Sequence, residues 1–448
     1  MNSLVVINWN LNSYIQMKNY YELKNSPSEN RYERRKFLKT SVVGGISVLC
    51  LPAVANGLNF WKDKLQYDLS LDNPTRYFDG DNCFVHPRTG IVPGAGKNGL
   101  PRIVMTMTTL DLSGSDVFKA AYGLQTDDLG KHWTTPQELK SLSPRFEIIE
   151  GERRPVALSD YWPKWHKQTK LLLGTGHTVV YTPDWKVTSP RPRHTSFSVY
   201  NPEISQWSDW QKMEMPDPEK FQNCGAGSTQ RFDRPDGTIL LPVYFVPPGA
   251  VNVSSVIVVR CAFDGKRLSY IEHGNELKLD VPRGYGEPSL TLFKGNYFLT
   301  LRNDKQGYVT KGSDGLHFDE PKAWTFDDGE DLGNYNTQQH WVTHSDVLFL
   351  VYTRRGADND HVFRHRAPLF MAQVDPDKLC VIRDTERILV PERGARLGNF
   401  GVTDISADET WVTVSEWMQP RGVEKYGSDG SVFIARIKWN KPNNAFSA

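Results

Sequence analysis

The sequence predicts an all-β protein, a β-propeller of about six blades, or seven if two of the repeating units have been merged. One observation is a segment of apolar strand, glycine-containing turn, second apolar strand and charged cluster. It recurs four times, beginning near Cys224, Tyr285, Asn336 and Gly398. The copies lie roughly 50 to 60 residues apart, which is typical of a multi-bladed array. No long amphipathic helix interrupts them, so the units pack against one another.

A radial arrangement of the sheets is expected because a single sheet leaves one of its faces exposed. A lone four-stranded sheet cannot bury both of its faces, whereas several sheets stacked around an axis cover each other. The last unit is one strand short, and the lead-in strand expected from Gln66 to Leu71 could supply it and join the two ends of the chain. A two-sheet sandwich and a parallel β-helix are the alternatives, but the coil of a β-helix is far shorter than this spacing.

The expected strands are short runs rich in β-branched and aromatic residues, bounded by clusters of Gly, Asp and Pro. In chain order they are 83–88, 102–110 and 118–124 in unit one; 156–160, 170–174 and 196–200 in unit two; 238–245 and 254–263 in unit three; 289–293 and 297–301 in unit four. Unit five spans about 336–389, and unit six runs from 399 to a last strand at 431–439.

Composition limits the function classes. The 448 residues are 39% hydrophobic and 23% charged, which indicates a globular protein. The formal net charge is +1, so no global field attracts nucleic acid, and we expect no nucleic-acid partner and no membrane insertion. Preference for an acidic ligand must therefore come from a local cluster. The high aromatic content, 12%, fits both strands and sugar-binding surfaces.

The N-terminal region has the pattern of an export signal. Arg34 and Arg35 form a twin arginine, an apolar run follows at 41–51, and Ala53-Val54-Ala55 has the small-x-small pattern of a signal-peptidase site. We therefore expect a twin-arginine-type signal in residues 1–55, cleavage after Ala55, and a periplasmic protein. No linker divides the rest, so residues 56–448 are expected to form a single catalytic domain.

Four cysteines remain after such cleavage: Cys83, Cys224, Cys261 and Cys380. None belongs to a CxxC pair, so the spacing of a zinc site is absent. Their scatter favours buried thiols over disulfides. We expect no metal and no cofactor.

One turn carries a family motif. Thr126 to Trp133 reads TDDLGKHW and matches the Asp-box pattern, Ser/Thr-x-Asp-x-Gly-x-x-aromatic. Ser313 to Phe318 looks like a shortened version. The chain thus resembles the sialidase-like superfamily of Asp-box, or BNR-repeat, propellers from about Cys83 to Trp439. The motif is structural, because its Asp caps turn amides and its aromatic ring packs beneath the turn.

The chain departs from true sialidases at a functional position. Those enzymes open with Phe-Arg-Ile-Pro, whose Arg holds the substrate carboxylate. The matching place reads Phe84-Val85-His86-Pro87, so sialidase activity is not expected. The sequence instead resembles propellers of bacteria that degrade acidic polysaccharides, among them ulvan-type uronate lyases, a rhamnosyl-glucuronate hydrolase and an oligosaccharide dehydratase. The resemblance implies an enzyme in which His and Arg act on a uronate.

Candidate site residues follow from propeller geometry, because the start of each inner strand and the loop after each second strand share one face. The candidates for catalysis are His86, His177, His340, Tyr244 and Glu287, and those for substrate binding are Arg88, Arg154, Gln230, Arg302, Gln339 and Arg354. Each also has a structural interpretation. His340 and Tyr244 could be core residues, Glu287 could pair with Arg302, and Arg354 could belong to a solvated loop.

A basic, His-bearing pocket suits an anionic sugar, since guanidinium groups bind carboxylate or sulfate in a bidentate manner. We therefore predict β-elimination on the uronic acid of an acidic oligosaccharide. Arg, Gln or Asn neutralises the carboxylate, while His and Tyr serve as base and acid. The enzyme is a lyase if a sugar leaves C4 and a dehydratase if water leaves. A glycoside hydrolase using two carboxylates and a non-catalytic sugar-binding propeller are the alternatives.

Overall fold

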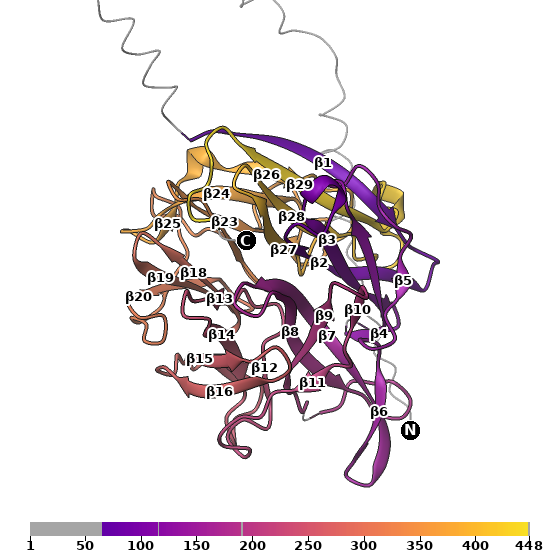
Figure 1. Ribbon diagram of the computed structural model, residues 1–448. Coiled ribbons are helices and arrows are strands. Elements are labelled where there is room, and N and C mark those ends of the chain that lie inside the picture. Colours follow the sequence, from indigo (N-terminus) through magenta and orange to yellow (C-terminus); the bar gives the residue numbers. More distant parts are fainter. Residues whose placement is uncertain (1–64, 115, 190, 447–448) are drawn as a thin grey trace, which may run out of the picture. The chain divides into compact units, whose positions relative to one another are not determined.

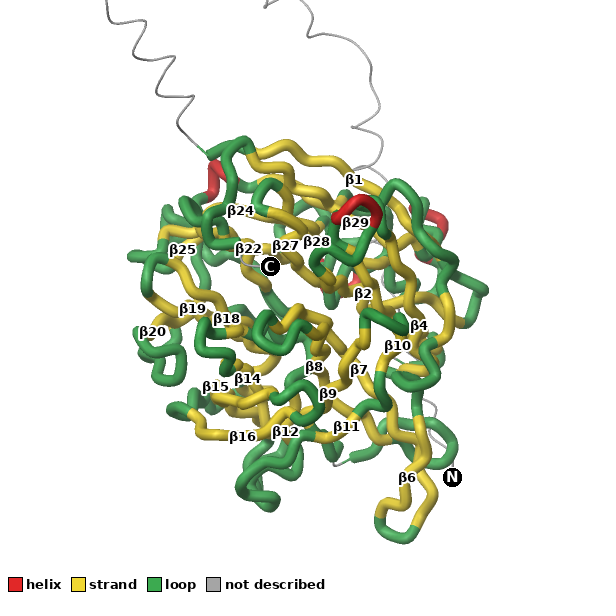
Figure 2. Tube along the Cα trace, viewed as in Figure 1, coloured by secondary structure: helices red, strands yellow, loops and turns green. Residues whose placement is uncertain are grey.

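The computed structural model describes residues 65–446 except 115 and 190, and the predicted export signal lies outside these described residues. The described strands form six sheets, and the chain passes through them in order around a ring (Figure 1). Figure 2 shows that nearly all regular structure is strand, with only short helical turns in the loops. The predicted six-bladed propeller is confirmed.

The first three blades are built from residues 82–284. Blade 1 contains β2 (Asn82–Val92), β3 (Arg102–Asp111), β4 (Val117–Thr126) and β5 (Gln137–Glu138). Blade 2 contains β6 (Arg145–Ile149), β7 (Glu152–His166), β8 (Leu171–Val180), β9 (Thr195–Asn201), β10 (Gln206–Trp207) and β11 (Gln211–Lys212). Blade 3 contains β12 (Cys224–Gly225), β13 (Phe232–Asp233), β14 (Ile239–Phe245), β15 (Val253–Phe263), β16 (Leu268–His273) and β17 (Arg283–Gly284).

The remaining blades complete the ring. Blade 4 contains β18 (Gly286–Phe293), β19 (Asn296–Arg302), β20 (Tyr308–Gly312) and β21 (Lys322–Ala323). Blade 5 contains β22 (His340–Thr343), β23 (Leu348–Tyr352), β24 (Leu369–Asp375), β25 (Cys380–Val381) and β26 (Arg387–Val390). Blade 6 contains β27 (Gly401–Ser406), β28 (Glu409–Ser415), β29 (Ser431–Trp439) and β1 (Tyr67–Arg76). The short helical turns are η1 (Lys97–Gly99), η2 (Phe363–His365), η3 (Arg383–Thr385) and η4 (Val423–Tyr426).

The two ends of the propeller meet in blade 6, as the sequence predicts. Strand β1 pairs with β29 in antiparallel register, from Tyr67 opposite Trp439 to Arg76 opposite Ser431 (Figure 1). The first described strand thus becomes the outermost strand of the last sheet. Because this pairing fastens the ring, it removes an open seam between the first and last blades.

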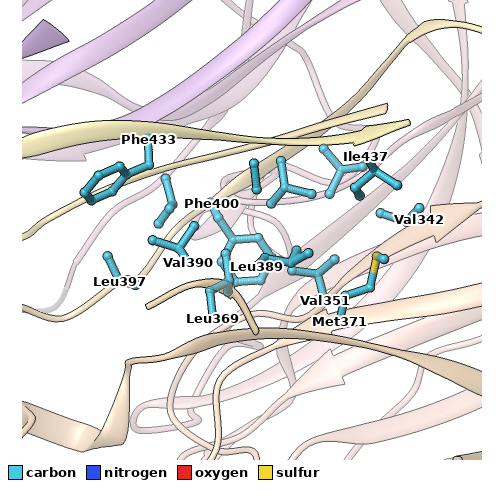
Figure 3. Close-up of a cluster of buried hydrophobic side chains, with 14 of the residues drawn as sticks. Val342, Val351, Leu369, Met371, Leu389, Val390, Leu397, Phe400, Phe433 and Ile437 are labelled. Atoms are coloured by element: carbon cyan, nitrogen blue, oxygen red, sulfur yellow. The ribbon is translucent and has the colours of Figure 1, made fainter. Parts of the chain in front are cut away.

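Apolar wedges between neighbouring blades hold the ring together. Figure 3 shows the wedge between blades 5 and 6, where Val351 and Met371 of one sheet lie opposite Phe433 and Ile437 of the other. Phe400, which precedes β27, lies among them and is fully buried. Burying side chains of this size contributes about 1.5–3 kcal/mol each, so the stacked faces supply the core that a single sheet lacks.

Two smaller predictions about the scaffold are also confirmed. In the Asp-box turn, Asp128 Oδ1 accepts a hydrogen bond from the His132 amide at 2.9 Å, and the Trp133 ring packs against Trp411. All four cysteines in the described part of the chain are buried and free. In residues 65–446, no helix is long and apolar enough to cross a membrane.

Candidate active site

Each of the six blades carries a non-glycine residue with a left-handed backbone where the chain enters its innermost strand. These residues are His86, Asp160, Ser228, Glu287, Asn336 and Asn399, with φ between 42° and 58°. In blades 1, 2 and 4 the residue sits at a β-bulge, where the register between the first and second strands shifts. Such backbone is uncommon outside glycine and concentrates at functional sites. Three of the six residues, Asp160, Glu287 and Asn399, line the cavity described below.

Asp160 is the centre of this group. Its Oδ1 atom accepts hydrogen bonds from Ser228 Oγ at 2.5 Å and Asn399 Nδ2 at 2.7 Å. The same oxygen lies 3.4 Å from Arg88 Nη2 and 3.3 Å from His86 Nε2. Burial alone would raise the pKa of this carboxyl, but the surrounding His86, Arg88 and His177 hold it far below the ordinary range. Asp160 is therefore a buried, permanently ionised carboxylate.

A chain of polar contacts leads from Asp160 to the cavity. Tyr244 at the end of β14 has its hydroxyl 3.2 Å from His177 Nδ1, and His177 Nε2 faces Asp160 Oδ2 at 4.0 Å. The main chain at Gly227 presses against the imidazole, since a Cβ there would lie 2.1 Å from Nδ1. The ring is thus held between Tyr244 and Asp160.

The protonation states of this chain follow from burial. Desolvation is the largest cause that lowers the pKa of His177 well below its ordinary value, so the imidazole is neutral at pH 7. Desolvation also raises the pKa of Tyr244 to about 12, so the phenol carries its proton. Because His177 Nε2 faces the Asp160 carboxylate, the ring proton is favoured on Nε2, which leaves Nδ1 to accept from the Tyr244 hydroxyl. In this arrangement His177 can accept the phenolic proton, and the imidazolium formed would face a carboxylate.

A cavity of about 370 Å³ opens above these residues. It is lined by the loops that follow the second strand of each blade and by the starts of the inner strands, including Asp116, Phe118, Asn252, Asn303 and Trp417. Its volume lies in the range of small-molecule sites. The loops after the second strands and the starts of the inner strands thus share one face of the propeller, as the sequence predicts.

Two buried arginines of the cavity have no carboxylate partner. Arg366 donates to the Asn336 main-chain oxygen, while its Nε atom has no partner. Arg396 donates to Gln419 Oε1 at 2.5 Å, and its Nε also has none. Burial is the largest cause that lowers the pKa of both guanidinium groups, to about 10 for Arg396, and neighbouring arginines add to it. A buried charge is costly when it is unpaired, so Arg366 and Arg396 together form a site that favours binding of an anion.

Two further cations of the wall have different roles. The Arg193 guanidinium lies over the Tyr244 ring, 4.5 Å from its centroid, and lowers the pKa of that phenol in opposition to burial. Arg302 instead pairs with Glu287 and, at 3.1 Å, with Asp304 Oδ1. The second oxygen of Glu287, Oε2, is buried without a partner. Arg193 therefore favours a Tyr244 phenolate, whereas Arg302 is largely neutralised.

Four of the residues predicted from sequence line the cavity: His177, Tyr244, Glu287 and Arg302. Two more lie directly beneath it. The His86 ring packs between Phe118 and Trp417 with centroid separations of 4.8 and 5.3 Å, and Arg88 contacts Asp160 and Ser228. His86 and Arg88 thus hold Asp160 from below, instead of lining the cavity as the sequence predicts.

Three other predicted residues belong to the scaffold. His340 stacks between Trp162 and Phe400, and its Nδ1 lies 2.7 Å from Ser289 Oγ. The Gln230 amide bonds to the main chain of Trp341, and the Gln339 amide to Thr300 and Thr337. None of the three lines the cavity, and their contacts join neighbouring strands, although the His340 Nε2 atom has no partner.

Arg154 and Arg354, which the sequence predicts as substrate-binding residues, also lie outside the cavity. Arg154 pairs with Glu150 and Glu152 in the hairpin of β6 and β7. Arg354 makes a bidentate contact with Glu386, with nitrogen–oxygen distances of 2.8 and 2.7 Å. Their charges are already compensated within the protein.

Sequence reasoning missed Asp160, Arg193, Arg366 and Arg396. Asp160 gives a signal, since it is a single carboxylate inside the apolar run of β7, Val156 to Trp162. A charge in such a run must be paired or functional. The three arginines lie in loops rich in charge and proline, where nothing local separates a cavity residue from a solvated one.

The buried histidines predict how stability depends on pH. Burial lowers the pKa of His86 to about 4 and those of His177 and His340 well below the ordinary value. Below pH 6.5 the unfolded chain binds protons that the folded chain does not, so stability falls with falling pH. His86 alone should lower the free energy of unfolding by about 2 kcal/mol between pH 7 and pH 5. Urea unfolding at the two values measures this, and equal stability would show that these rings are protonated in the folded state.

Comparison with solved structures gives the same fold. A protein of unknown function from Dyadobacter fermentans is similar with a TM-score of 0.55 and 13% identity, over 83% of this chain and 99% of that one. A sialidase from Trypanosoma rangeli has a TM-score of 0.51 and 13% identity, over 82% of this chain. The NanB sialidase from Streptococcus pneumoniae has a TM-score of 0.53 and 10% identity, over 82% of this chain and 70% of that one.

These similarities concern the fold. The chain spans 59% of the length of the Trypanosoma rangeli sialidase. No protein-family model matches the chain, and no curated protein matches it in sequence. The neighbours therefore place the chain among sialidase-like propellers in architecture, and its chemistry has to be argued from its own cavity.

Proposed function

We propose that this protein binds an acidic sugar and cleaves it by β-elimination at a uronic acid, leaving an unsaturated uronate. The observation that carries the proposal is the cavity itself. It brings two buried arginines without carboxylate partners, Arg366 and Arg396, together with a tyrosine connected to a histidine and an aspartate. Several structures with this fold are sialidases, which supports a sugar ligand.

The uronate carboxylate is the group for Arg366 and Arg396. Elimination at C4 and C5 needs that carboxylate neutralised, because the proton on C5 becomes acidic only when negative charge can spread into the carboxyl group. Guanidinium groups do this through paired hydrogen bonds. Neither guanidinium has a carboxylate partner within the described part of the chain, and both line the cavity. Binding the carboxylate compensates charges that the folded protein leaves unpaired.

Tyr244 is the group for proton transfer. Its proton passes to His177 Nδ1, and the phenolate, stabilised by Arg193 over its ring, takes the proton from C5. The electron pair of the C5–H bond forms the C4–C5 double bond as the C4–O bond breaks. The departing oxygen then takes the proton from Tyr244, and His177 returns its proton to the phenolate, which restores the starting state. A sugar leaving from C4 makes the enzyme a lyase, and water leaving makes it a dehydratase.

The direct test is incubation with uronate-capped oligosaccharides while the absorbance of the unsaturated-uronate band is recorded. A rise in absorbance supports elimination. Release of reducing sugar without the band would replace elimination with hydrolysis, and binding without either product would leave a sugar-binding protein. The export pattern before Ala55 supports a periplasmic site of action, which fractionation of cells that make the full chain can check.

Hydrolysis is a second candidate because of Glu287. This carboxylate lines the same cavity as Tyr244 and raises the pKa of the phenol, so the two groups interact. Its Oε2 atom has no partner. A tyrosine beside a free carboxylate oxygen could act as a nucleophile with its base. Glu287→Gln should then abolish reducing-sugar release, whereas under elimination it should reduce turnover only modestly.

Arg366→Gln is predicted to lower kcat/KM for a uronate substrate by about tenfold to a hundredfold, the usual loss for one charge-assisted hydrogen-bonded contact. The loss should appear in kcat as well as in KM, because the carboxylate gains negative charge as C5 loses its proton. Steady-state kinetics measure it. Arg154→Gln is the matched control, since Arg154 has its own carboxylate partners outside the cavity, and it should behave as wild type. Equal effects of the two changes would refute the assignment.

A further inference from the structure

The cavity holds more positive charge than one carboxylate can compensate. Seven arginines and four carboxylates line it. All four carboxylates are already engaged: Asp116 with Arg191, Glu287 with Arg302, Asp304 with Arg283 and Arg302, and Asp160 with Arg88 below. The four arginines left without a carboxylate in the described part of the chain are Arg193, Arg364, Arg366 and Arg396.

The four uncompensated arginines lie on two walls. Arg364, Arg366 and Arg396 come from the loops before β24 and β27, in blades 5 and 6, and their charges act on one another. Arg193 comes from the loop between β8 and β9 in blade 2 and stacks on Tyr244 of blade 3. In a six-bladed ring, blades 2 and 3 face blades 5 and 6 across the axis (Figure 1). Arg193 and the other three arginines thus lie on opposite sides of one cavity.

We infer that the ligand carries at least two negative charges, one bound by Arg366 and Arg396 and the other by Arg193 on the opposite wall. This inference rests on the proposed function and specifies its substrate class, an acidic sugar with a second anionic group. That group is either a sulfate ester on the reacting ring or the carboxylate of a neighbouring uronate. Both present oxygens that a guanidinium binds through paired hydrogen bonds.

The test uses the Tyr244→Phe variant, which keeps the ring under Arg193 but cannot turn over. Calorimetry compares three ligands: a disaccharide of one uronate and one neutral sugar, the same disaccharide with a sulfate ester on the uronate, and a diuronate. We expect one or both dianions to bind at least tenfold more tightly than the size-matched monoanion. Whichever dianion gains the affinity identifies the second group.

A second substitution tests whether Arg193 causes the tighter binding of the dianion. Adding Arg193→Gln should remove most of the advantage of the dianion and leave the affinity for the monoanion within about twofold. Affinities for all three ligands within twofold of each other would overturn the inference, as would an equal loss for monoanion and dianion on Arg193→Gln. Wild-type protein run in parallel separates the two proposals. Unsaturated product with no preference for dianions refutes only this inference, and tight dianion binding without any product refutes only the elimination.

Discussion

Replacing Tyr244 with phenylalanine is expected to lower turnover by about a thousandfold while leaving ligand affinity within a few-fold of wild type. The substitution removes one oxygen and keeps the ring on which Arg193 stacks. What disappears is the group that exchanges a proton with His177 Nδ1, and losing a general acid or base typically costs 10²–10⁴-fold. Product absorbance and calorimetric binding, measured on one preparation, separate the two effects.

His177→Gln is the partner experiment. Glutamine can still hydrogen-bond to Tyr244 but cannot take its proton at neutral pH, so turnover should fall by a similar factor. The double variant should be no slower than either single one, because both changes remove the same proton pathway. Additive losses would mean that Tyr244 and His177 act separately, and more than a tenth of wild-type turnover in Tyr244→Phe would assign proton transfer to another group.

The scaffold could be predicted from sequence because its signal is local. In the hairpin of β18 and β19, apolar strands alternate with a glycine turn, and the expected strands 289–293 and 297–301 fall inside Gly286–Phe293 and Asn296–Arg302. The polar ends of this hairpin, Glu287 and Arg302, reach the cavity as predicted. Strand periodicity fixes which residues end a strand, and propeller geometry then fixes the face on which they lie.

The bulges could not be predicted in the same way. Six non-glycine residues with positive φ lie in or just before the inner strands, yet nothing in their identities marks a left-handed backbone. The prediction selected Gln230 and Gln339, a few residues beyond Ser228 and Asn336, because it assumed regular strands from the first residue. The Gln230 side chain instead bonds to the main chain of Trp341, a partner distant in sequence.

The role of each arginine depends on partners that are distant in sequence. Arg354 is neutralised by Glu386 and Arg302 by Glu287, whereas Arg366 and Arg396 have no carboxylate partner, and burial followed by neighbouring arginines lowers the pKa of both. The amino-acid composition does not distinguish the paired arginines from the unpaired ones. Only Arg154, whose partners are two and four residues away, could have been excluded from sequence by its acidic neighbours.

Asp160→Asn is expected to destabilise the protein by about 3–5 kcal/mol, the usual loss when one partner of a buried ion pair is removed. Asparagine has nearly the same shape and can still accept a hydrogen bond from Ser228. It cannot supply the negative charge that Arg88 and His86 face at 3.4 and 3.3 Å. The Arg88 guanidinium would then stay buried without its partner. Urea unfolding of both proteins at pH 7 measures the difference.

Asp304→Asn is the matched control, because Asp304 also lines the cavity and pairs with Arg302, but its side chain is 37% exposed. Exposed pairs contribute about 1 kcal/mol or less, so this change should be nearly neutral. Equal losses for the two variants would mean that water reaches Asp160.

The Asp160→Asn substitution should also affect catalysis, since the imidazolium of His177 would face a neutral amide. If Asp160→Asn folds at low temperature, its turnover should still be reduced at least tenfold, which separates support of the relay from support of the fold.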